Sequence, residues 1–391
     1  MSEDNSFDDS NRYFECERIN KAVDEEKFTQ LKDLVYAQDN LEDYPFDVVE
    51  GVKMYLRNYD PSNKSEGRYT HGGGNSFSQT EIINCLQYPE EKRIDYLAYR
   101  YKFKEFPRNK VLDSFPIVLA VEPTSVCNIR CTMCFQSDES FSGNPSEMGY
   151  MDMDLYKKII DEASENKLRS LVLASRGEPL LHPQICEMIG YAKEKGIFDI
   201  KLNTNATTLT PELSRRLLSA EPNLVVFSLD SAEKEEFEKI RCGANLEEIV
   251  SNIRSFKEIR DSEFRGSQTR TRLSMTILSE KQDIEAAKEF YSPLVDEFAV
   301  HKAVERLRIY DSHQTNEENP CRLLWERLYV WWDGTVNPCD EDYLSYLSPG
   351  KLEGETTISS IWGGDKMEKL RQLHISQMRS KSLPCDRCPR A

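Results

Sequence analysis

From about residue 113 onward, short apolar runs alternate with longer stretches in which apolar positions recur at helical spacing. The apolar runs are rich in β-branched residues, as expected of strands buried on both faces. Strands are therefore predicted at residues 115–123, 169–175, 198–207, 223–231, 271–278 and 297–304. Helices are predicted between them, at residues 152–166, 182–196, 210–220, 245–261 and 280–294. This alternation with short loops predicts the α/β class, with a parallel sheet and helices packed outside it.

The N-terminal part of the chain has a different texture. Residues 1–112 begin with a polar stretch and then show helical periodicity around residues 25–40 and 90–106. We therefore predict a mostly helical N-terminal extension over residues 1–112.

The C-terminal part also departs from the alternating pattern. Residues 328–332 and 335–339 predict two strands joined by a turn at Asp333 and Gly334, and a helix is expected within residues 356–381. The chain is thus divided into an extension (1–112), a central α/β region (113–310) and a small α+β part (311–391).

Composition narrows the range of partners and the compartment. The chain has 68 acidic and 51 basic residues in 391, a formal net charge of −17, which disfavours nucleic acid as a general partner. No apolar run is long enough to span a bilayer, and the polar N-terminus lacks the pattern of a signal peptide. A cytoplasmic protein with no membrane partner is expected.

The clustering of cysteines is the strongest chemical signal. Cys127, Cys131 and Cys134 follow the first predicted strand of the central region. In a parallel α/β fold the functional site lies at the carboxyl ends of the strands, where these thiols are expected. Three thiolates can bind three irons of a [4Fe–4S] cube and leave the fourth iron open. Zinc with a distant fourth ligand is the alternative for this spacing.

The stretch "CNIRCTMC", residues 127–134, resembles the CxxxCxΦC signature of the radical S-adenosylmethionine (SAM) superfamily, with Met133 at the Φ position. This resemblance implies a partial (β/α)6 barrel like that of TIM. It also implies that SAM binds the open iron and that reductive cleavage of SAM yields a 5′-deoxyadenosyl radical. Such a radical removes a hydrogen atom from the substrate. The cofactor carries the difficult step, and the protein orients the reactants.

Further motifs resemble this family at the ends of later strands. "SRGEPLLHP", residues 175–183, resembles the family's GGEP motif, with Arg176 where glycine is common. Gly177 would let the backbone approach a ligand, and Glu178 would accept hydrogen bonds from the SAM ammonium group. Hydrogen bonding at strand ends and helix caps is the alternative for several of these residues. The resemblance implies cofactor contacts by Phe135, Gly177, Glu178, Asn203, Asn205, Ser228 and Arg241. His182 is expected to order its loop.

A second set of cysteines follows the hairpin. Cys321, Cys339, Cys385 and Cys388 resemble the SPASM/twitch extension of the same superfamily, which binds auxiliary [4Fe–4S] clusters. Four cysteines fit one fully ligated cluster, as in the shorter twitch form. A structural zinc ribbon is the alternative. The order and spacing resemble those of the radical SAM dehydrogenase that oxidises an aminocyclitol alcohol.

A fully ligated cluster cannot bind substrate through iron, but it can accept an electron from a substrate radical. This favours the oxidation of a small polar metabolite such as a sugar, an aminocyclitol or a nucleotide sugar. A flavodoxin or ferredoxin reductant is implied by the resemblance, and the catalytic base is left unassigned. A peptide-crosslinking enzyme, an epimerase with Cys186 or Cys242 as hydrogen donor, and an iron–sulfur or zinc regulatory protein are the alternatives.

Overall fold

The computed structural model describes residues 13–18, 23–37, 44–60, 75–303, 307 and 309–389. Its centre is a row of six parallel strands with the order β2-β4-β5-β6-β8-β9, each at or inside a segment predicted from the sequence. These strands are β2 (Val118–Val121), β4 (Ser170–Leu173), β5 (Asp199–Thr204), β6 (Leu224–Ser228), β8 (Arg270–Ile277) and β9 (Glu297–Lys302). The α/β fold class is confirmed.

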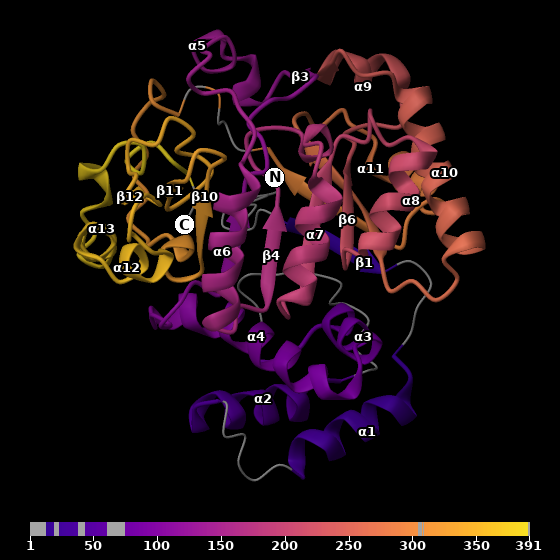
Figure 1. The fold of residues 1–391 in the computed structure, drawn as a ribbon, viewed down its shortest axis with the longest axis vertical. Helices are drawn as coiled ribbons and strands as arrows, with labels where there is room; N and C mark the ends of the chain where they lie inside the picture. The colour runs from indigo at the N-terminus through magenta and orange to yellow at the C-terminus, as the bar shows by residue number, and fades with distance from the viewer. Residues whose placement is uncertain are drawn as a thin grey trace, which may run out of the picture.

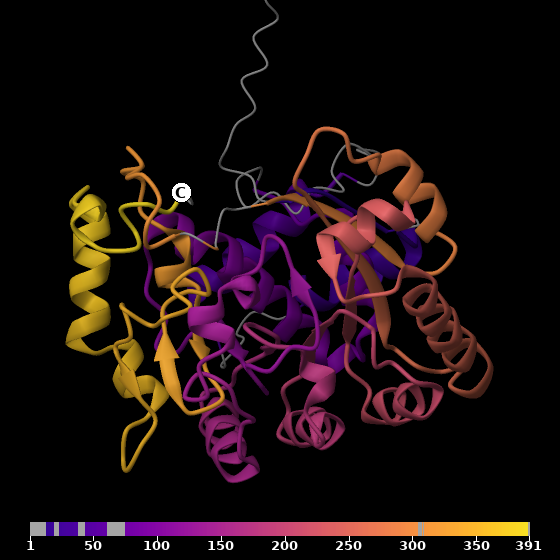
Figure 2. The ribbon, with the colours of Figure 1, turned by 90° about the horizontal axis from the view of Figure 1, so that it is seen from above.

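The predicted helices cover the outer face of these strands. They are α6 (Met153–Glu165), α7 (Ile185–Glu194), α8 (Pro211–Ala220), α10 (Leu246–Glu263) and α11 (Ile284–Tyr291), with the short α9 (Lys234–Ile240) as an addition. Seen from above, the outer helices follow one another in a curved row around the strands (Figure 2). Thr210 caps α8 by accepting a hydrogen bond from the Leu213 amide. The curvature fits the expected partial barrel.

Alternation along the strands separates two environments. On β8, Leu273 and Met275 belong to the main apolar core beneath the helices. Because successive side chains of a strand point to opposite faces, Arg272, Ser274 and Thr276 face the inside of the partial barrel. The barrel lumen is therefore lined by polar side chains on this strand.

Four N-terminal helices close the amino ends of the strands. They are α1 (Glu25–Tyr36), α2 (Phe46–Asn58), α3 (Gln79–Gln87) and α4 (Glu90–Asn109), and they lie at the opposite end of the sheet from α5 (Glu139–Ser142) (Figure 1). Their core includes Val118 of β2 and Phe198, which precedes β5. Asp95 of α4 also pairs with Arg169 at 2.8 Å. α1 and α4 agree with the predicted helices, whereas α2 and α3 were not singled out in the sequence.

The C-terminal part extends the barrel sheet. β10 (Arg327–Val330) pairs in parallel with β2, and the hairpin continues through β11 (Thr335–Asn337) to β12 (Gly350–Lys351). Gly334 has φ 87° at the predicted turn, a conformation that favours glycine. α12 (Ile358–Trp362) and α13 (Asp365–Ile375) follow. The predicted hairpin is confirmed, and its pairing makes one continuous ten-stranded sheet.

The remaining elements are short or lie at an edge of the sheet. β1 (Tyr13–Arg18) pairs antiparallel with β9, and β3 (Arg130–Cys131) pairs with β7 (Arg241–Cys242). Single 3-10 turns occur at η1 (Phe135–Ser137), η2 (Pro179–Leu181), η3 (Arg322–Trp325) and η4 (Arg379–Lys381). Across the ranges that the structure describes, no helix combines the length and apolar character needed to cross a membrane.

Glu81 of α3 is the charged anchor of the N-terminal helices. It is 1% exposed and pairs with Arg100 at 2.8 Å and Lys104 at 2.6 Å, and it completes a capping box with Ser78. Burial alone would raise the pKa of Glu81, but Lys104 and Arg100 lower it to about 2. The two ion pairs of Glu81 therefore stabilise the fold at pH values above the ordinary glutamate pKa of 4.5. This contribution is lost as the pH falls toward 2.

We expect Glu81→Gln to lower the opening free energy of α3 and α4 by about 3 kcal/mol, because it leaves two cations near a buried neutral group. Hydrogen exchange of amides in residues 75–110 at neutral pH measures this change. Glu50→Gln is the control, since Glu50 pairs with Lys53 at the surface and should shift the value by less than about 1 kcal/mol. Equal effects of the two substitutions would contradict the assignment of Glu81 as an anchor.

Candidate active site

The first cysteine loop lies at the carboxyl end of the parallel strands, as predicted. The arrow of β4 points toward β3, which contains Cys131 (Figure 1). The loop is fixed by the β3–β7 pairing, in which Cys131 lies opposite Arg241, and by a 2.9 Å bond from the Thr132 amide to the Ile240 carbonyl. A loop held in its middle in this way can present three thiols in a defined arrangement.

Cys127, Cys131 and Cys134 lie within electrostatic range of one another. Burial raises the pKa of Cys127 to about 12 and that of Cys131 to about 11, and the neighbouring thiols contribute to both shifts. Such thiols need a positive partner to ionise, and iron supplies one. In the described part of the chain, no three His, Cys, Asp or Glu side chains are arranged to hold a single metal ion. The soft three-sulfur donor set itself fits a cluster in which each thiolate binds a different iron.

Glu178 is buried in the loop that follows β4. Its Oε1 accepts from the Leu180 amide at 3.0 Å and the Thr204 hydroxyl at 2.7 Å, and its Oε2 accepts from the Asn205 amide at 2.7 Å. Burial raises the pKa of Glu178, and these donors oppose the rise. A carboxylate offers about four acceptor positions, so one remains for a further donor such as an ammonium group.

Gly177 is required by a close approach between two loops. A Cβ at this position would lie 2.2 Å from the Thr124 carbonyl oxygen and 2.6 Å from the Val126 carbonyl oxygen. The close approach that demands glycine is therefore to the backbone preceding Cys127, not to a ligand as the sequence analysis expected. The Glu178 amide also donates to the Val126 carbonyl at 2.9 Å, which locks the two loops together.

The asparagines after β5 have distinct positions. Asn205 is buried, and its Nδ2 donates to the Asn128 Oδ1 at 3.1 Å, which ties this strand end to the cysteine loop. Asn203 Oδ1 is buried and has no hydrogen-bond partner. Ser228 at the end of β6 lies in register with Ser274 of β8. An unpaired buried oxygen is an unusual feature that a bound ligand can satisfy.

A chain of polar contacts runs from the cysteine loop into the lumen. Arg241 Nη1 lies 3.8 Å from the Cys131 sulfur, and its Nε donates to Asp230 at 2.8 Å. The other oxygen of Asp230 accepts from the Thr276 amide at 2.9 Å. Thr276 Oγ1 in turn lies 3.0 Å from His301 Nε2. Arg241 was expected to pair with SAM, and here its buried guanidinium pairs with Asp230 and Cys131.

The second set of cysteines is gathered in the C-terminal part. Burial raises the pKa of Cys339 and that of Cys385, and the charges of other cysteines of the set raise both values further. Cys388 is among the neighbours of both, and Cys321 is a neighbour of Cys385. Arg379 is 1% exposed and donates to the carbonyls of Cys385 and Cys388. Four thiols from three separate segments thus meet around one buried region.

Comparison with known families identifies both cysteine sites. The radical SAM superfamily model matches residues 121–266, and the SPASM model, an iron–sulfur cluster-binding domain, matches residues 321–389. The chain therefore contains a radical SAM domain followed by a SPASM domain. The radical SAM domain brings SAM and a [4Fe–4S] cluster, and the SPASM domain brings an auxiliary iron–sulfur cluster, so iron–sulfur chemistry takes the place of the zinc alternatives.

Individual relatives agree at the level of the fold. The cofactor-modifying protein of the tungsten-containing aldehyde ferredoxin oxidoreductase of Pyrococcus furiosus is 38% identical over 113 residues, which is 29% of this chain and 30% of that protein. Native anSMEcpe with bound AdoMet matches with a TM-score of 0.51 and 16% identity over 70% of this chain and 88% of that chain. BtrN in complex with AdoMet and 2-DOIA matches with a TM-score of 0.47 and 23% identity over 69% and 92%.

The match to curated sequences is partial. The chain spans between 30% and 44% of the length of the curated relatives that it resembles at 30% identity or more. The matched part of the family is therefore the radical SAM domain, and the reaction must be argued from the site.

Arg176 joins the radical SAM domain to the SPASM domain. Its guanidinium binds Glu122 through two bonds of 2.8 Å and donates to the Tyr343 carbonyl at 3.0 Å. It also lies 4.4 Å from the centre of the Trp331 ring. Glu122 is fully buried after β2, and the sequence analysis assigned it no role. The signal in the sequence that could have identified Glu122 is a charged residue directly after a buried strand.

Phe135, for which a contact with SAM is expected, is packed at the domain boundary. It is 1% exposed and stacks on Tyr343 of the SPASM domain, with ring centres 4.9 Å apart. His182 orders its loop as expected, since its Nδ1 accepts from the Gln184 amide and its Nε2 contacts the Met151 carbonyl.

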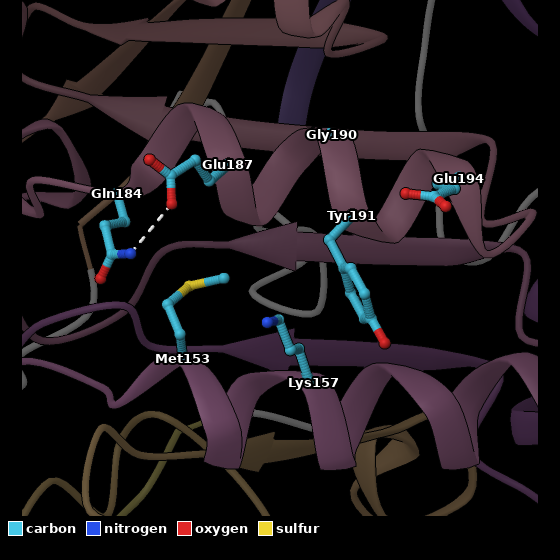
Figure 3. Close-up of a pocket in the computed structure, with 7 residues that line it drawn as sticks. All are labelled: Met153, Lys157, Gln184, Glu187, Gly190, Tyr191 and Glu194. Atoms are coloured by element: carbon cyan, nitrogen blue, oxygen red, sulfur yellow. Dashed lines mark hydrogen bonds between the residues drawn. The ribbon is translucent and has the colours of Figure 1, made fainter.

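Of the thiols considered for an epimerase, Cys242 adjoins the first cysteine loop, since it pairs with Arg130 and acts electrostatically on Cys131. Cys242 is exposed and contacts the Lys239 carbonyl, and Cys186 lies on α7 beside Arg215 and Arg216. The groove between α6 and α7 lies on this outer helical layer as well (Figure 3). Its lining includes Lys157 but none of the residues predicted for the site.

We expect replacement of Cys127, Cys131 and Cys134 by alanine to abolish SAM cleavage and to leave about four irons per chain. The SPASM cysteines come from separate segments of the C-terminal part, so their cluster should persist. Iron analysis and the absorbance near 400 nm of anaerobically reconstituted protein measure the outcome. A variant that binds no iron would show that the two cysteine sets do not form separate sites.

Proposed function

We propose that the protein is a radical SAM oxidoreductase that dehydrogenates an alcohol of a small polar metabolite such as a sugar or aminocyclitol. Cys127, Cys131 and Cys134 would hold the SAM-binding cluster, and Cys321, Cys339, Cys385 and Cys388 the auxiliary cluster. The bound cofactors supply hydrogen-atom abstraction and one-electron acceptance. A flavodoxin or ferredoxin as reductant and a cytoplasmic location are parts of this proposal.

The observation that carries the proposal is the gathering of four cysteines beside the barrel. A cluster bound by four protein thiolates has no open iron for a substrate, so electron transfer is the role left to it. Cys339 packs against a cluster formed by Ala120 of β2, Tyr329 of the neighbouring β10 and Trp331, which directly follows β10. The auxiliary site therefore adjoins the sheet that forms the lumen.

The lumen offers groups suited to a substrate rich in hydroxyls. Asn203, Ser228, Ser274, Thr276 and His301 come from adjacent strands near their carboxyl ends. Convergent amide, hydroxyl and imidazole groups orient a polar ligand by hydrogen bonds. The unpaired Asn203 oxygen supports a ligand in this position.

His301 is the titratable lumen residue best placed to accept a hydroxyl proton. Its Nε2 lies 3.0 Å from Thr276 Oγ1, and its Nδ1 lies 3.4 Å from Ser274 Oγ. A substrate hydroxyl bonded to Thr276 could pass its proton through that hydroxyl to the imidazole. The substrate then loses one hydrogen atom, one proton and one electron, which together make a ketone from a secondary alcohol.

The proposed function is tested by incubating reconstituted protein with SAM, dithionite and a cell-extract metabolite fraction. We expect 5′-deoxyadenosine to form together with a small metabolite lighter by two mass units. A mass loss confined to a peptide fraction would favour crosslinking. Unchanged mass with uptake of solvent deuterium would favour epimerisation. Either result would contradict the proposed oxidation.

We expect His301→Gln to slow formation of the lighter product at least about tenfold while SAM cleavage without substrate is unchanged. The glutamine keeps a hydrogen-bonding group but cannot take up a proton at neutral pH. The pH profile of product formation distinguishes the two roles of His301. If the residue accepts a proton, the acidic limb of the profile is lost in His301→Gln, and if it only positions the substrate, the limb remains. His313→Gln is the control, because His313 is exposed in the C-terminal part. Equal product rates in the two variants would exclude His301 as the proton acceptor.

A further inference from the structure

A buried aromatic cluster lies between the two sets of cysteines. Phe135, Phe141, Tyr343 and Cys388 belong to one apolar cluster, and Cys134 packs against it. Cys134 comes from the loop of the radical SAM domain, and Cys388 comes from the end of the SPASM domain. This cluster therefore touches one proposed ligand of each iron–sulfur site.

Two rings form the centre of the contact. Phe135 directly follows Cys134, and its ring lies nearly parallel to that of Tyr343, with centres 4.9 Å apart and an angle of 20°. Phe141 meets both rings edge-on at 5.6 Å. Phe135 and Tyr343 are at most 2% exposed, so no water separates them from their neighbours. The packing is continuous from one cysteine-bearing segment to the other.

The Tyr343 ring is fixed in place by its hydroxyl group. This hydroxyl donates to Asp138 Oδ2 at 2.9 Å and also lies 3.3 Å from the Leu307 carbonyl. Burial and the nearby Asp138 raise the pKa of Tyr343, so the phenol stays protonated at neutral pH. The main-chain carbonyl of the same residue accepts from Arg176. A ring held from both sides keeps a constant distance to Phe135.

We propose that the Phe135–Tyr343 stack is the route by which an electron passes between the two iron–sulfur sites. One site loses the electron and the other gains it, and neither ring is itself oxidised. The rings fill the space between the two sites with closely packed atoms. Electronic coupling decreases less steeply with distance through such contacts than through a gap. The proposal rests on the presence of two clusters and not on the proposed oxidation of an alcohol.

A second contact between the domains is less suitable. Trp331 packs near Cys339, but the group above its ring on the barrel side is the Arg176 guanidinium at 4.4 Å. That cation is bound to the buried carboxylate of Glu122. No aromatic stack of described residues is seen between Trp331 and the first cysteine loop, whereas Phe135 adjoins Cys134 in the chain.

The test uses the full protein with both clusters and SAM as the probe. The protein is reduced with dithionite and freed of excess reductant, then mixed with SAM and frozen at increasing times. The electron paramagnetic resonance signal of the auxiliary cluster is followed, with the Cys127/Cys131/Cys134 triple alanine variant as its reference spectrum. Because SAM cleavage is irreversible, the electron of the auxiliary cluster should also be consumed. Its signal should then disappear, and about two 5′-deoxyadenosine molecules should form per chain.

Tyr343→Leu removes the ring and is expected to slow the decay of the auxiliary signal at least about tenfold, while the first 5′-deoxyadenosine forms at the normal rate. Tyr343→Phe keeps the ring and loses only the hydroxyl bonds, so its decay should stay near the wild-type rate. Phe141→Leu is the matched control, because it opens a similar space in the same cluster without interrupting the stack.

Two results would overturn the proposal. One is an auxiliary signal in the wild-type protein that persists after SAM is cleaved, and the other is equal decay in Tyr343→Leu and Tyr343→Phe. Iron analysis shows whether Tyr343→Leu retains both clusters, and Tyr343→Met replaces it if iron is lost. Each of these outcomes is independent of the substrate, so failure here is distinguishable from failure of the proposed oxidation.

Discussion

The buried ion pair between Glu122 and Arg176 holds the functional end of this protein together. Glu122 ends the first parallel strand and Arg176 ends the second, and both side chains are almost fully excluded from water. Burial of two charges is unfavourable unless their geometry is good and their other polar atoms are bonded. Arg176 meets this condition with two bonds to Glu122, and its backbone carbonyl accepts from the Gln136 side chain at 2.5 Å. The pair therefore fixes the cysteine loop, the loop of Glu178 and the SPASM domain relative to one another.

Two kinds of contact lead away from the cysteine loop. One is polar and runs from the Cys131 sulfur through Arg241, Asp230 and Thr276 to His301. The other is aromatic and runs through the rings that separate Cys134 from Cys388. Polar groups serve the lumen, where a hydroxyl-bearing substrate needs hydrogen bonds, and apolar rings serve the domain boundary, where water must be excluded. The same cysteine loop is thus connected to the lumen by hydrogen bonds and to the auxiliary cysteines by aromatic packing.

Local patterns in the sequence were sufficient for the six parallel strands, the main outer helices and the C-terminal hairpin. They failed where a contact depends on residues distant in the chain. Arg176 was judged an odd residue in a glycine position, because its partner Glu122 lies 54 residues earlier. Phe135 was assigned to the cofactor from its place beside Cys134, and its stack on Tyr343 could not be foreseen because that partner belongs to the SPASM domain. Gly177 was identified correctly as a close-approach residue, but only the fold shows that the approach is to the backbone of Thr124 and Val126. The parallel pairing of β10 with β2 is equally non-local.

The charges around the two cysteine sets differ. A buried arginine accompanies each set, and a cation beside thiolates lowers the free energy of burying negative charge. Arg241 shares its charge with Asp230, which accepts from its Nε at 2.8 Å. Arg379 donates instead to the backbone carbonyls of Asn319, Cys385 and Cys388, which carry no net charge. Carboxyl groups lie beside the thiols of this second set, since, in addition to burial, Asp342 and Asp340 raise the pKa of Cys339 and Glu326 raises that of Cys321. The two sites therefore differ in how their buried cation is neutralised: Asp230 pairs directly with Arg241, whereas the carboxyl groups near Arg379 lie beside the thiols.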